Sequence, residues 1–281
     1  MVKIVQTRNS TQHRLLPKLL CILALCWPVL LLIAAAENDA ATSISAADSV
    51  RLFVEKELSE SPPKPKSKIV RLQLATLYAG KAGVEDWSVT YLPEGLLGIN
   101  VASTGWSTIK GSRLSLAGFV DLVDAVDSEA SWASSTAVSV GRVYIPFTLN
   151  TAQVSSSASR LDELSGDIGL AIKASANSSF QFRQLKITDR KSKTGWFSSS
   201  GTLKNSFVIS CTVGEDKPAA ELNPNLRGDY RLAKCEYKNV TGPSSRQEYA
   251  YLVDSGIYVR LFSQGSKTEF TYSVTAVDYE K

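Results

Sequence analysis

The feature that most constrains this chain is an uncharged apolar run at residues 19–36, LLCILALCWPVLLLIAAA. Four basic residues and no acidic residue precede it, and the chain turns polar at Glu37. A basic head, an apolar stretch and small residues at its end are typical of an export signal. We therefore expect the rest of the chain to fold and act in an extracytoplasmic compartment: the periplasm, the cell surface or the medium.

The apolar run has two possible fates. Ala34 and Ala36 supply the small residues that a signal peptidase needs, which predicts cleavage after Ala36. As a helix the run would be about 27 Å long, close to the hydrocarbon thickness of about 30 Å, so a retained anchor stays open. We therefore expect a signal peptide or signal anchor at residues 1–36. Any membrane contact would then come from residues 19–36, if they are not cleaved.

Charge and histidine content exclude several functions. The chain has 31 basic and 27 acidic residues, and residues 1–36 hold four of the basic ones. The exported part is therefore neutral and lacks the positive charge that binds nucleic acid. The only histidine, His13, precedes the apolar run. Without imidazole, a Ser-His-Asp triad, a Cys-His dyad and a histidine-ligated metal are excluded. We expect no cofactor, no metal and a binding protein rather than an enzyme.

Two cysteines remain after the apolar run, Cys211 and Cys235. An isolated pair in an oxidising compartment is most simply one disulfide. Both cysteines lie in segments of alternating apolar residues, 203–213 and 229–237, on the apolar face of each segment. The pattern predicts that the two thiols meet in the core.

Residues 37–67 are expected to form a short helix and a linker. Ser45 suits the N-cap, and apolar residues then recur at helical spacing: Val50, Phe53, Val54 and Leu58. We expect this stripe to dock on the body of the protein, with a partner helix as the alternative. Three prolines within residues 59–67 favour an extended linker.

From residue 69 the pattern is typical of a mainly β protein. Short apolar or alternating runs, separated by turn residues, predict strands at 69–78, 87–92, 97–103, 138–149, 168–174 and 179–188. Pro146 favours an edge or a bulge within its strand. The runs at 249–253, 257–262 and 270–277 predict an antiparallel meander. The fold class we expect is an antiparallel β-sandwich or barrel.

Residues 154–159, VSSSAS, form the best internal boundary. They would divide the body into β-rich halves at 68–159 and 160–281, of which the second carries the disulfide. The alternative is a long loop within one domain. Residues 114–127 are ambiguous, and we expect a strand that runs into a short helix. On that helix Asp121, Asp124 and Asp127 would form a solvated acidic face, with a cation site as the alternative.

Aromatic residues in turn contexts are the candidate binding residues. Trp196 and Phe197 lie between Gly195 and a serine run, and Trp106 lies in STGWST. Such residues can stack on a sugar or insert into a partner, or else close one end of the core. Trp87 and Trp132 are expected in the core.

These observations favour an exported β-rich binding or structural protein with a protein or glycan partner. One alternative is a secreted carbohydrate-active hydrolase with paired carboxylates, for which Asp162, Glu163 and Asp167 are the candidates. Another is a membrane-anchored assembly subunit.

Overall fold

The computed structural model describes residues 46–60, 64–92, 95–105, 108–140, 143–194, 197–240 and 242–281. For residues 60 and 130–152 it describes the backbone alone. The predicted signal, the proposed cap Ser45 and the proline run at 61–63 lie outside the described residues. No helix within the described ranges is long and apolar enough to cross a membrane.

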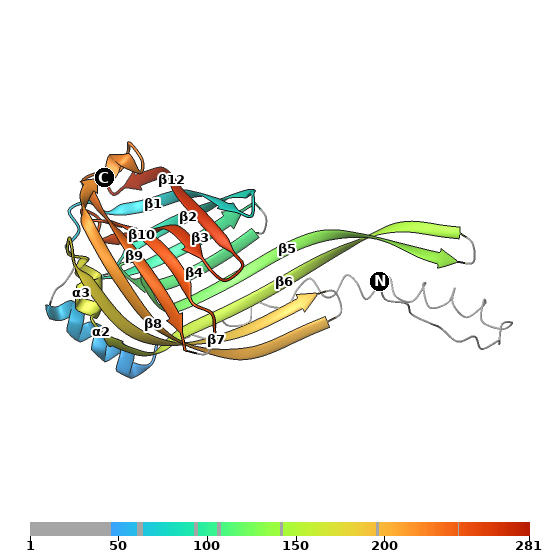
Figure 1. Cartoon of the computed structure of the whole chain (residues 1–281), viewed down its shortest axis with the longest axis horizontal. Coiled ribbons are helices and arrows are strands. Elements are labelled where there is room, and N and C mark those ends of the chain that lie inside the picture. Colours follow the sequence, from blue (N-terminus) through green and yellow to red (C-terminus); the bar gives the residue numbers. More distant parts are fainter. Residues whose placement is uncertain are drawn as a thin grey trace. The chain divides into compact units, whose positions relative to one another are not determined.

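Twelve antiparallel strands in the described residues form one closed barrel (Figure 1). Each strand pairs with its neighbours in sequence, and β1 closes the ring by pairing with β12. The strands are β1 (Ile69–Tyr78), β2 (Lys81–Tyr91), β3 (Leu96–Thr104), β4 (Thr108–Leu116), β5 (Val120–Val140), β6 (Val143–Gly166), β7 (Ser179–Thr194), β8 (Phe197–Pro218), β9 (Asp229–Asn239), β10 (Ser245–Leu252), β11 (Ile257–Gln264) and β12 (Glu269–Tyr279). The predicted mainly β, antiparallel, barrel-like fold is confirmed, including the C-terminal meander. Residues 154–159 lie inside β6, and strands from both proposed halves share the one sheet.

Helix α2 (Asp48–Glu60) docks on the barrel through the predicted apolar stripe. Val50, Val54 and Leu58 are at most 5% exposed and belong to the main core cluster. The backbone N–H of Ala47, just before the helix, donates to the carbonyl of Leu161 in β6. The docking interpretation of this stripe is therefore confirmed.

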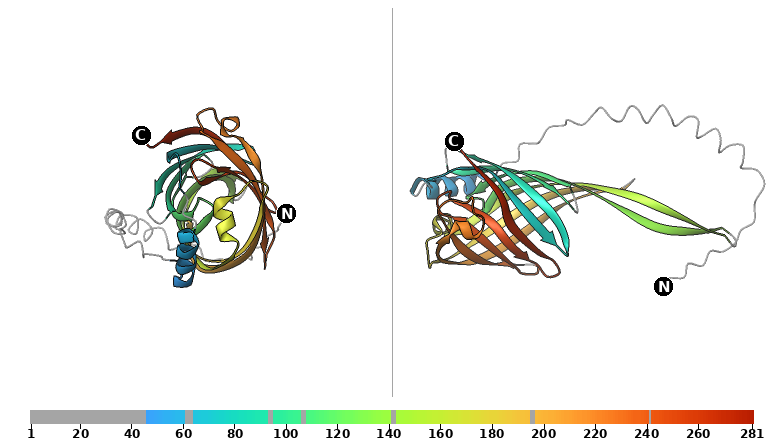
Figure 2. Two further views of the ribbon diagram at one scale, coloured as in Figure 1. Left: turned by 90° about the vertical axis from the view of Figure 1, so that its left-hand side faces the viewer. Right: turned by 90° about the horizontal axis from the view of Figure 1, so that it is seen from above.

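The strand predicted at 168–174 is wrong, because Ile168–Lys173 form a helix, α3. Seen end-on, α3 lies within the ring of strands (Figure 2). Ile168, Ala171 and Ile172 are buried, and the Tyr258 hydroxyl donates to the Ala171 carbonyl at 2.6 Å. A short apolar run is compatible with a buried strand or a buried helix. The sequence of this run therefore does not distinguish the two, and the tertiary structure shows the helix.

Among the described residues, the core consists of two clusters on opposite faces of the β10–β11 hairpin. Alternate residues of a strand face opposite ways, so Tyr249, Tyr251 and Tyr258 join one cluster with α2 and α3. The residues between them join the other, with β1, β2 and β3: Ala250, Leu252, Ile257 and Val259. β11 pairs with β12 only from Phe262 to Gln264, and the Tyr258 N–H donates instead to the carbonyl of Ala117.

The helix predicted within residues 114–127 is also wrong. A turn at Ala117–Gly118 joins β4 to β5, and both of these residues have positive φ. Positive φ at two successive turn residues is typical of a type I′ hairpin turn, in which Asn-Gly is the strong sequence signal. Ala-Gly is a weak one, which is why the turn escaped sequence reasoning.

The disulfide is confirmed. Cys211 of β8 lies directly opposite Cys235 of β9, and the two are bonded. Both are buried in the main cluster, as the alternation predicted.

The interpretation of Pro146 as an edge residue also agrees with the pairing. At Pro146, β6 pairs with β5 on one side, whereas its pairing with β7 begins at Gln153.

Tyr91 makes barrel stability sensitive to alkaline pH. Its hydroxyl donates to the Ser255 carbonyl at 3.0 Å and accepts from the Ile69 N–H at 3.4 Å. Burial raises the pKa of Tyr91 to about 12. The folded state therefore holds this proton more tightly than the unfolded state, where the pKa is about 10. As pH rises from about 10 to about 12, ionisation of Tyr91 in the unfolded state therefore lowers the free energy of unfolding by about 2 kcal/mol.

We expect Tyr91→Phe to reduce this alkaline loss. Denaturant unfolding of both proteins at about pH 9 and about pH 11.5 measures it. Burial also raises the pKa of Tyr237 and Tyr258, so some loss persists in the variant. An equally steep loss in the variant and the wild type would contradict the assignment to Tyr91.

Candidate functional site in the barrel interior

The predicted binding residue Phe197 begins β8 and is 83% exposed. It therefore does not close the core, and its role in binding stays a prediction. Trp106 and Trp196 lie outside the described residues, as does the side chain of Trp132. Trp87 is a core residue, as expected, with 4% exposure.

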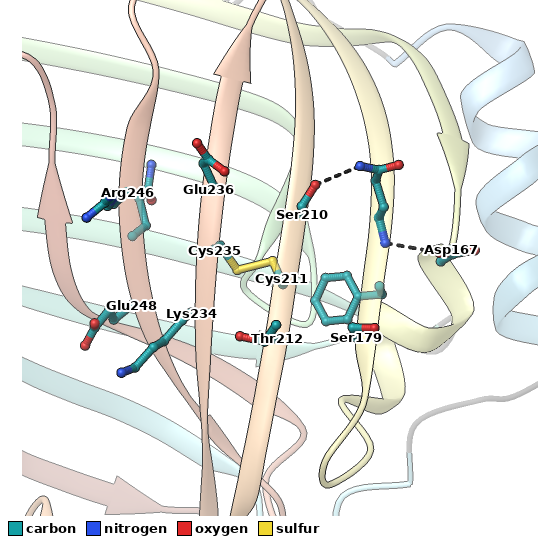
Figure 3. Close-up of a pocket in the computed structure, with 13 residues that line it drawn as sticks. Asp167, Ser179, Ser210, Cys211, Thr212, Lys234, Cys235, Glu236, Arg246 and Glu248 are labelled. Atoms are coloured by element: carbon teal, nitrogen blue, oxygen red, sulfur yellow. Dashed lines mark hydrogen bonds between the residues drawn. A yellow bond between two sulfur atoms is a disulfide. The ribbon is translucent and has the colours of Figure 1, made fainter.

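An open groove on the outer wall of β7 to β10 is one candidate site (Figure 3). Its charged groups already face partners across the strands: Lys234 is opposite Glu248, and Glu236 is opposite Arg246. Gln181 also donates to Ser210 at 2.8 Å. Cross-strand pairs of opposite charge are ordinary on the solvent face of a sheet. In the described residues, none of the buried polar atoms that lack a hydrogen-bond partner lies in this groove, so its lining gives no sign of a bound ligand.

The carboxylates proposed for hydrolysis are not arranged as a pair in this groove. Asp167 lines it and accepts a hydrogen bond from the Gln181 N–H at 3.0 Å. Asp162 lies on β6 and is not among the described residues that line the groove. Asp167 therefore has a structural role at the start of α3.

A second cavity, of about 320 Å³, lies inside the barrel and is lined by charged groups. β2, β4, β5, β7, β11 and β12 contribute its charged residues and one tyrosine: Glu85, Arg113, Asp121, Asp124, Lys186, Arg260 and Tyr272. Three of these groups are acids and three are bases. Charged side chains rarely enter a protein interior unless they are paired or serve a function.

Arg113 of β4 is held on two sides. Its guanidinium carbon lies 4.5 Å from the ring centroid of Trp87, and Nη1 lies 3.7 Å from Oδ2 of Asp121. Nε and Nη2 of Arg113 are buried and have no hydrogen-bond partner within the described residues, and the same is true of Oδ1 of Asp121. Leaving such a group unsatisfied costs about 1–3 kcal/mol, and more when it is charged.

Arg260 of β11 enters the cavity between two phenol rings. Its guanidinium carbon lies 5.8 Å from the ring centroid of Tyr249 and 5.9 Å from that of Tyr272. Burial by itself lowers the pKa of Arg260, but the oxygens of these tyrosines and of Tyr237 outweigh it and the pKa is raised. Arg260 therefore stays charged. Its Nε is buried without a partner in the described part of the chain.

Asp121 and Asp124 reach the cavity together because β5 contains a bulge. The ladder passes from the Ser115–Asp121 pair to the Leu114–Val123 pair, which makes Leu122 an extra residue. In a regular strand, residues three apart face opposite sides, and one inserted residue restores a common side. Lys186 of β7 donates to Asp124 at 2.7 Å.

The predicted solvated acidic face at 121–127 is therefore wrong for two of its three members. The side chains of Asp121 and Asp124 are 21% and 18% exposed and lie in ion pairs, whereas Asp127 is exposed. Within the described residues, no group of acidic, cysteine or histidine side chains is arranged to hold a metal ion.

No family model, no curated protein and no solved structure matches this chain. The function is therefore argued from the cavity itself.

Sequence reasoning missed Arg113 and Arg260 as site residues. Arg113 lies in an alternating segment, TIKGSRLSL, and Arg260 interrupts the apolar run IYVRLF. A charged residue inside an apolar strand is the signal that singles out Arg260. For Arg113 the alternation alone does not tell the inner face from the outer one.

Proposed function

We propose that this protein is an exported binding protein whose barrel cavity holds a small molecule with a carboxylate group. The observation that carries the proposal is the set of buried guanidinium N–H groups of Arg113 and Arg260 that have no partner among the described residues. A guanidinium presents parallel N–H donors that match the two oxygens of a carboxylate. The free Oδ1 of Asp121 would accept a hydrogen bond from an amine or hydroxyl group of the same ligand.

The size of the cavity limits the ligand. About 320 Å³ is at the lower end of the range for small-molecule pockets. Amino acids, hydroxy acids and uronic acids combine a carboxylate with a hydrogen-bond donor at this size. Uronic acids would agree with a glycan-related role. Binding of any of these ligands requires no catalytic step.

Export is part of the same proposal. A disulfide is typical of an oxidising compartment, and the apolar run at 19–36 has the pattern of an export signal. Both features support binding outside the cytoplasm.

The proposal is tested by titrating the purified protein with a panel of amino, hydroxy and uronic acids. Binding is followed by calorimetry and by tryptophan fluorescence, because Trp87 lines the cavity beneath Arg113. We expect Arg113→Gln and Arg260→Gln each to weaken binding by about 10–100-fold, the value of a charge-assisted hydrogen bond. Arg246→Gln in the outer groove is the control and should leave the affinity unchanged.

The ligand offers a second control. The primary amide of a bound acid keeps the shape but loses the charge, so it should bind at least tenfold more weakly. Equal affinity of acid and amide, or binding that survives both arginine substitutions, would contradict the proposed site.

A further inference from the structure

The β5–β6 hairpin continues well beyond the barrel as a two-stranded ribbon (Figure 1). We define the ribbon as residues 131–140 of β5 and 143–152 of β6, which form ten antiparallel pairs. β4 pairs with β5 only as far as Glu129, and β7 pairs with β6 only from Gln153. Both outer edges of the ribbon are thus without a strand partner within the described part of the chain.

The ribbon contains no charged residue over its whole paired length. On β5 the first charge below it is Glu129, and on β6 it is Arg160. In the sequence, two residues separate the two strands of the ribbon, and one of them, Arg142, is charged. About a fifth of the chain overall is charged, so twenty uncharged residues in a ribbon that extends beyond the barrel require an explanation.

The register divides the ribbon into two unlike faces. Residues paired across an antiparallel ladder share a face, and successive residues alternate between faces. One face, the apolar face, carries Trp132 with Thr151, Ser134 with Leu149, Thr136 with Phe147, Val138 with Ile145, and Val140 with Val143. The other, the polar face, carries Ser131 with Ala152, Ala133 with Asn150, Ser135 with Thr148, Ala137 with Pro146, and Ser139 with Tyr144.

The large apolar residues thus gather on the first face, and mostly small and hydroxyl residues gather on the second. Alternation of this kind over about ten residues is the pattern of a strand that has lipid on one side and water on the other. A strand needs about 9–11 residues to cross a bilayer at the usual tilt, and the ribbon has ten per strand.

Isolated two-stranded hairpins are marginally stable in water. In lipid a lone ribbon is also unfavourable, because every unpaired edge N–H and C=O costs several kcal/mol. Several ribbons side by side would pair these edges with one another and could close into a ring of strands. Pro146 has no backbone N–H, so that position would contribute no donor to the pairing. The polar faces would then line a water-filled lumen.

We propose that the ribbon inserts into a lipid bilayer, where copies of this chain align their ribbons into one closed transmembrane barrel. The membrane is the occupant of the apolar face, and neighbouring copies are the partners of the two edges. This activity is independent of ligand binding in the cavity, whose residues all lie outside the ribbon.

The test adds the purified protein, in the form that is exported, to vesicles of phosphatidylcholine and phosphatidylglycerol. It measures the release of a fluorescent dye trapped inside them. Phe147→Lys and Thr148→Lys form a matched pair, because these neighbours lie mid-way along the ribbon on its apolar and polar faces. We expect Phe147→Lys to slow release at least tenfold, since it would place a charge in the hydrocarbon. Thr148→Lys should permeabilise vesicles within about threefold of wild type.

A second measurement reads the environment of each face directly. A polarity-sensitive fluorophore on Ile145→Cys or Phe147→Cys should shift to the blue and be quenched by nitroxide-labelled lipid when vesicles are added. The same label on Tyr144→Cys or Thr148→Cys should do neither. Circular dichroism and an intact Cys211–Cys235 disulfide confirm that each variant folds.

Any one of four results would overturn the proposal. Vesicles could stay intact with wild-type protein, the two lysine variants could lose release equally, or the four labelled positions could respond alike. Ribbon association that is equally strong in buffer without vesicles would also contradict it, because it would make a second copy in water the occupant of the apolar face.

Discussion

Replacement of Tyr258 by alanine is expected to lower the free energy of unfolding by about 4 kcal/mol, the middle of the range for replacing a large buried aromatic residue by alanine. Tyr258 is fully buried where β10, the β4–β5 turn and α3 meet. Its ring stacks on Phe119 at a centroid distance of 4.6 Å and contacts Tyr251 at 4.8 Å. Alanine would leave a cavity among rigid elements that cannot close around it. Urea unfolding followed by circular dichroism measures the loss.

Tyr258→Phe separates the ring from the hydroxyl. It keeps the packing and removes the hydrogen bond to the Ala171 carbonyl, which holds α3 in the barrel. We expect a loss of about 1–3 kcal/mol, the cost of a buried acceptor left unsatisfied. If the phenylalanine variant lost as much as the alanine variant, the hydroxyl rather than the ring packing would dominate at this position.

Removal of the disulfide is expected to have the second-largest effect on stability. The bond joins residues 24 apart on neighbouring strands, and closing a loop of this length is worth about 3.5 kcal/mol in the chain-entropy model. The double variant Cys211→Ala, Cys235→Ala should therefore lose that amount of unfolding free energy, and it should unfold at a lower denaturant concentration. Both sulfurs are also part of the core, so the smaller alanines add to the loss.

Reduction of the wild-type protein provides the control for the double variant. Dithiothreitol opens the bond and keeps both side chains in place, so the difference between reduced wild type and the variant isolates the packing term. The reductant should leave the variant itself unchanged. A loss below about 1 kcal/mol on reduction would contradict this value and would show that the unfolded chain is already constrained without the bond.

Much of the fold could be predicted because it depends on short-range pattern. The helical spacing of Val50, Val54 and Leu58 predicted the face by which α2 docks. Period-two alternation predicted the C-terminal meander and placed Cys211 and Cys235 on inner faces. In each case the residues that carry the signal lie within one element, whose own geometry repeats every 3.6 or 2 residues.

The candidate site was not predictable in this way. A bulge at Leu122 brings Asp121 and Asp124 to one side of β5, and the local sequence pattern does not predict this bulge. Arg113 and Arg260 lie on strands far apart in sequence and line one cavity only because of the way the strands pair into a barrel. The helix α3 was mistaken for a strand because its short apolar run fits either.

The sequence by itself determined the β class of this protein, its docking helix and its disulfide, because each rests on composition or on neighbouring residues. The tertiary structure alone decided what the barrel encloses and how β5 and β6 are aligned in the ribbon. Strand register and barrel closure set both. They depend on which distant segments pair, and a slip of one residue would exchange the two faces of a strand.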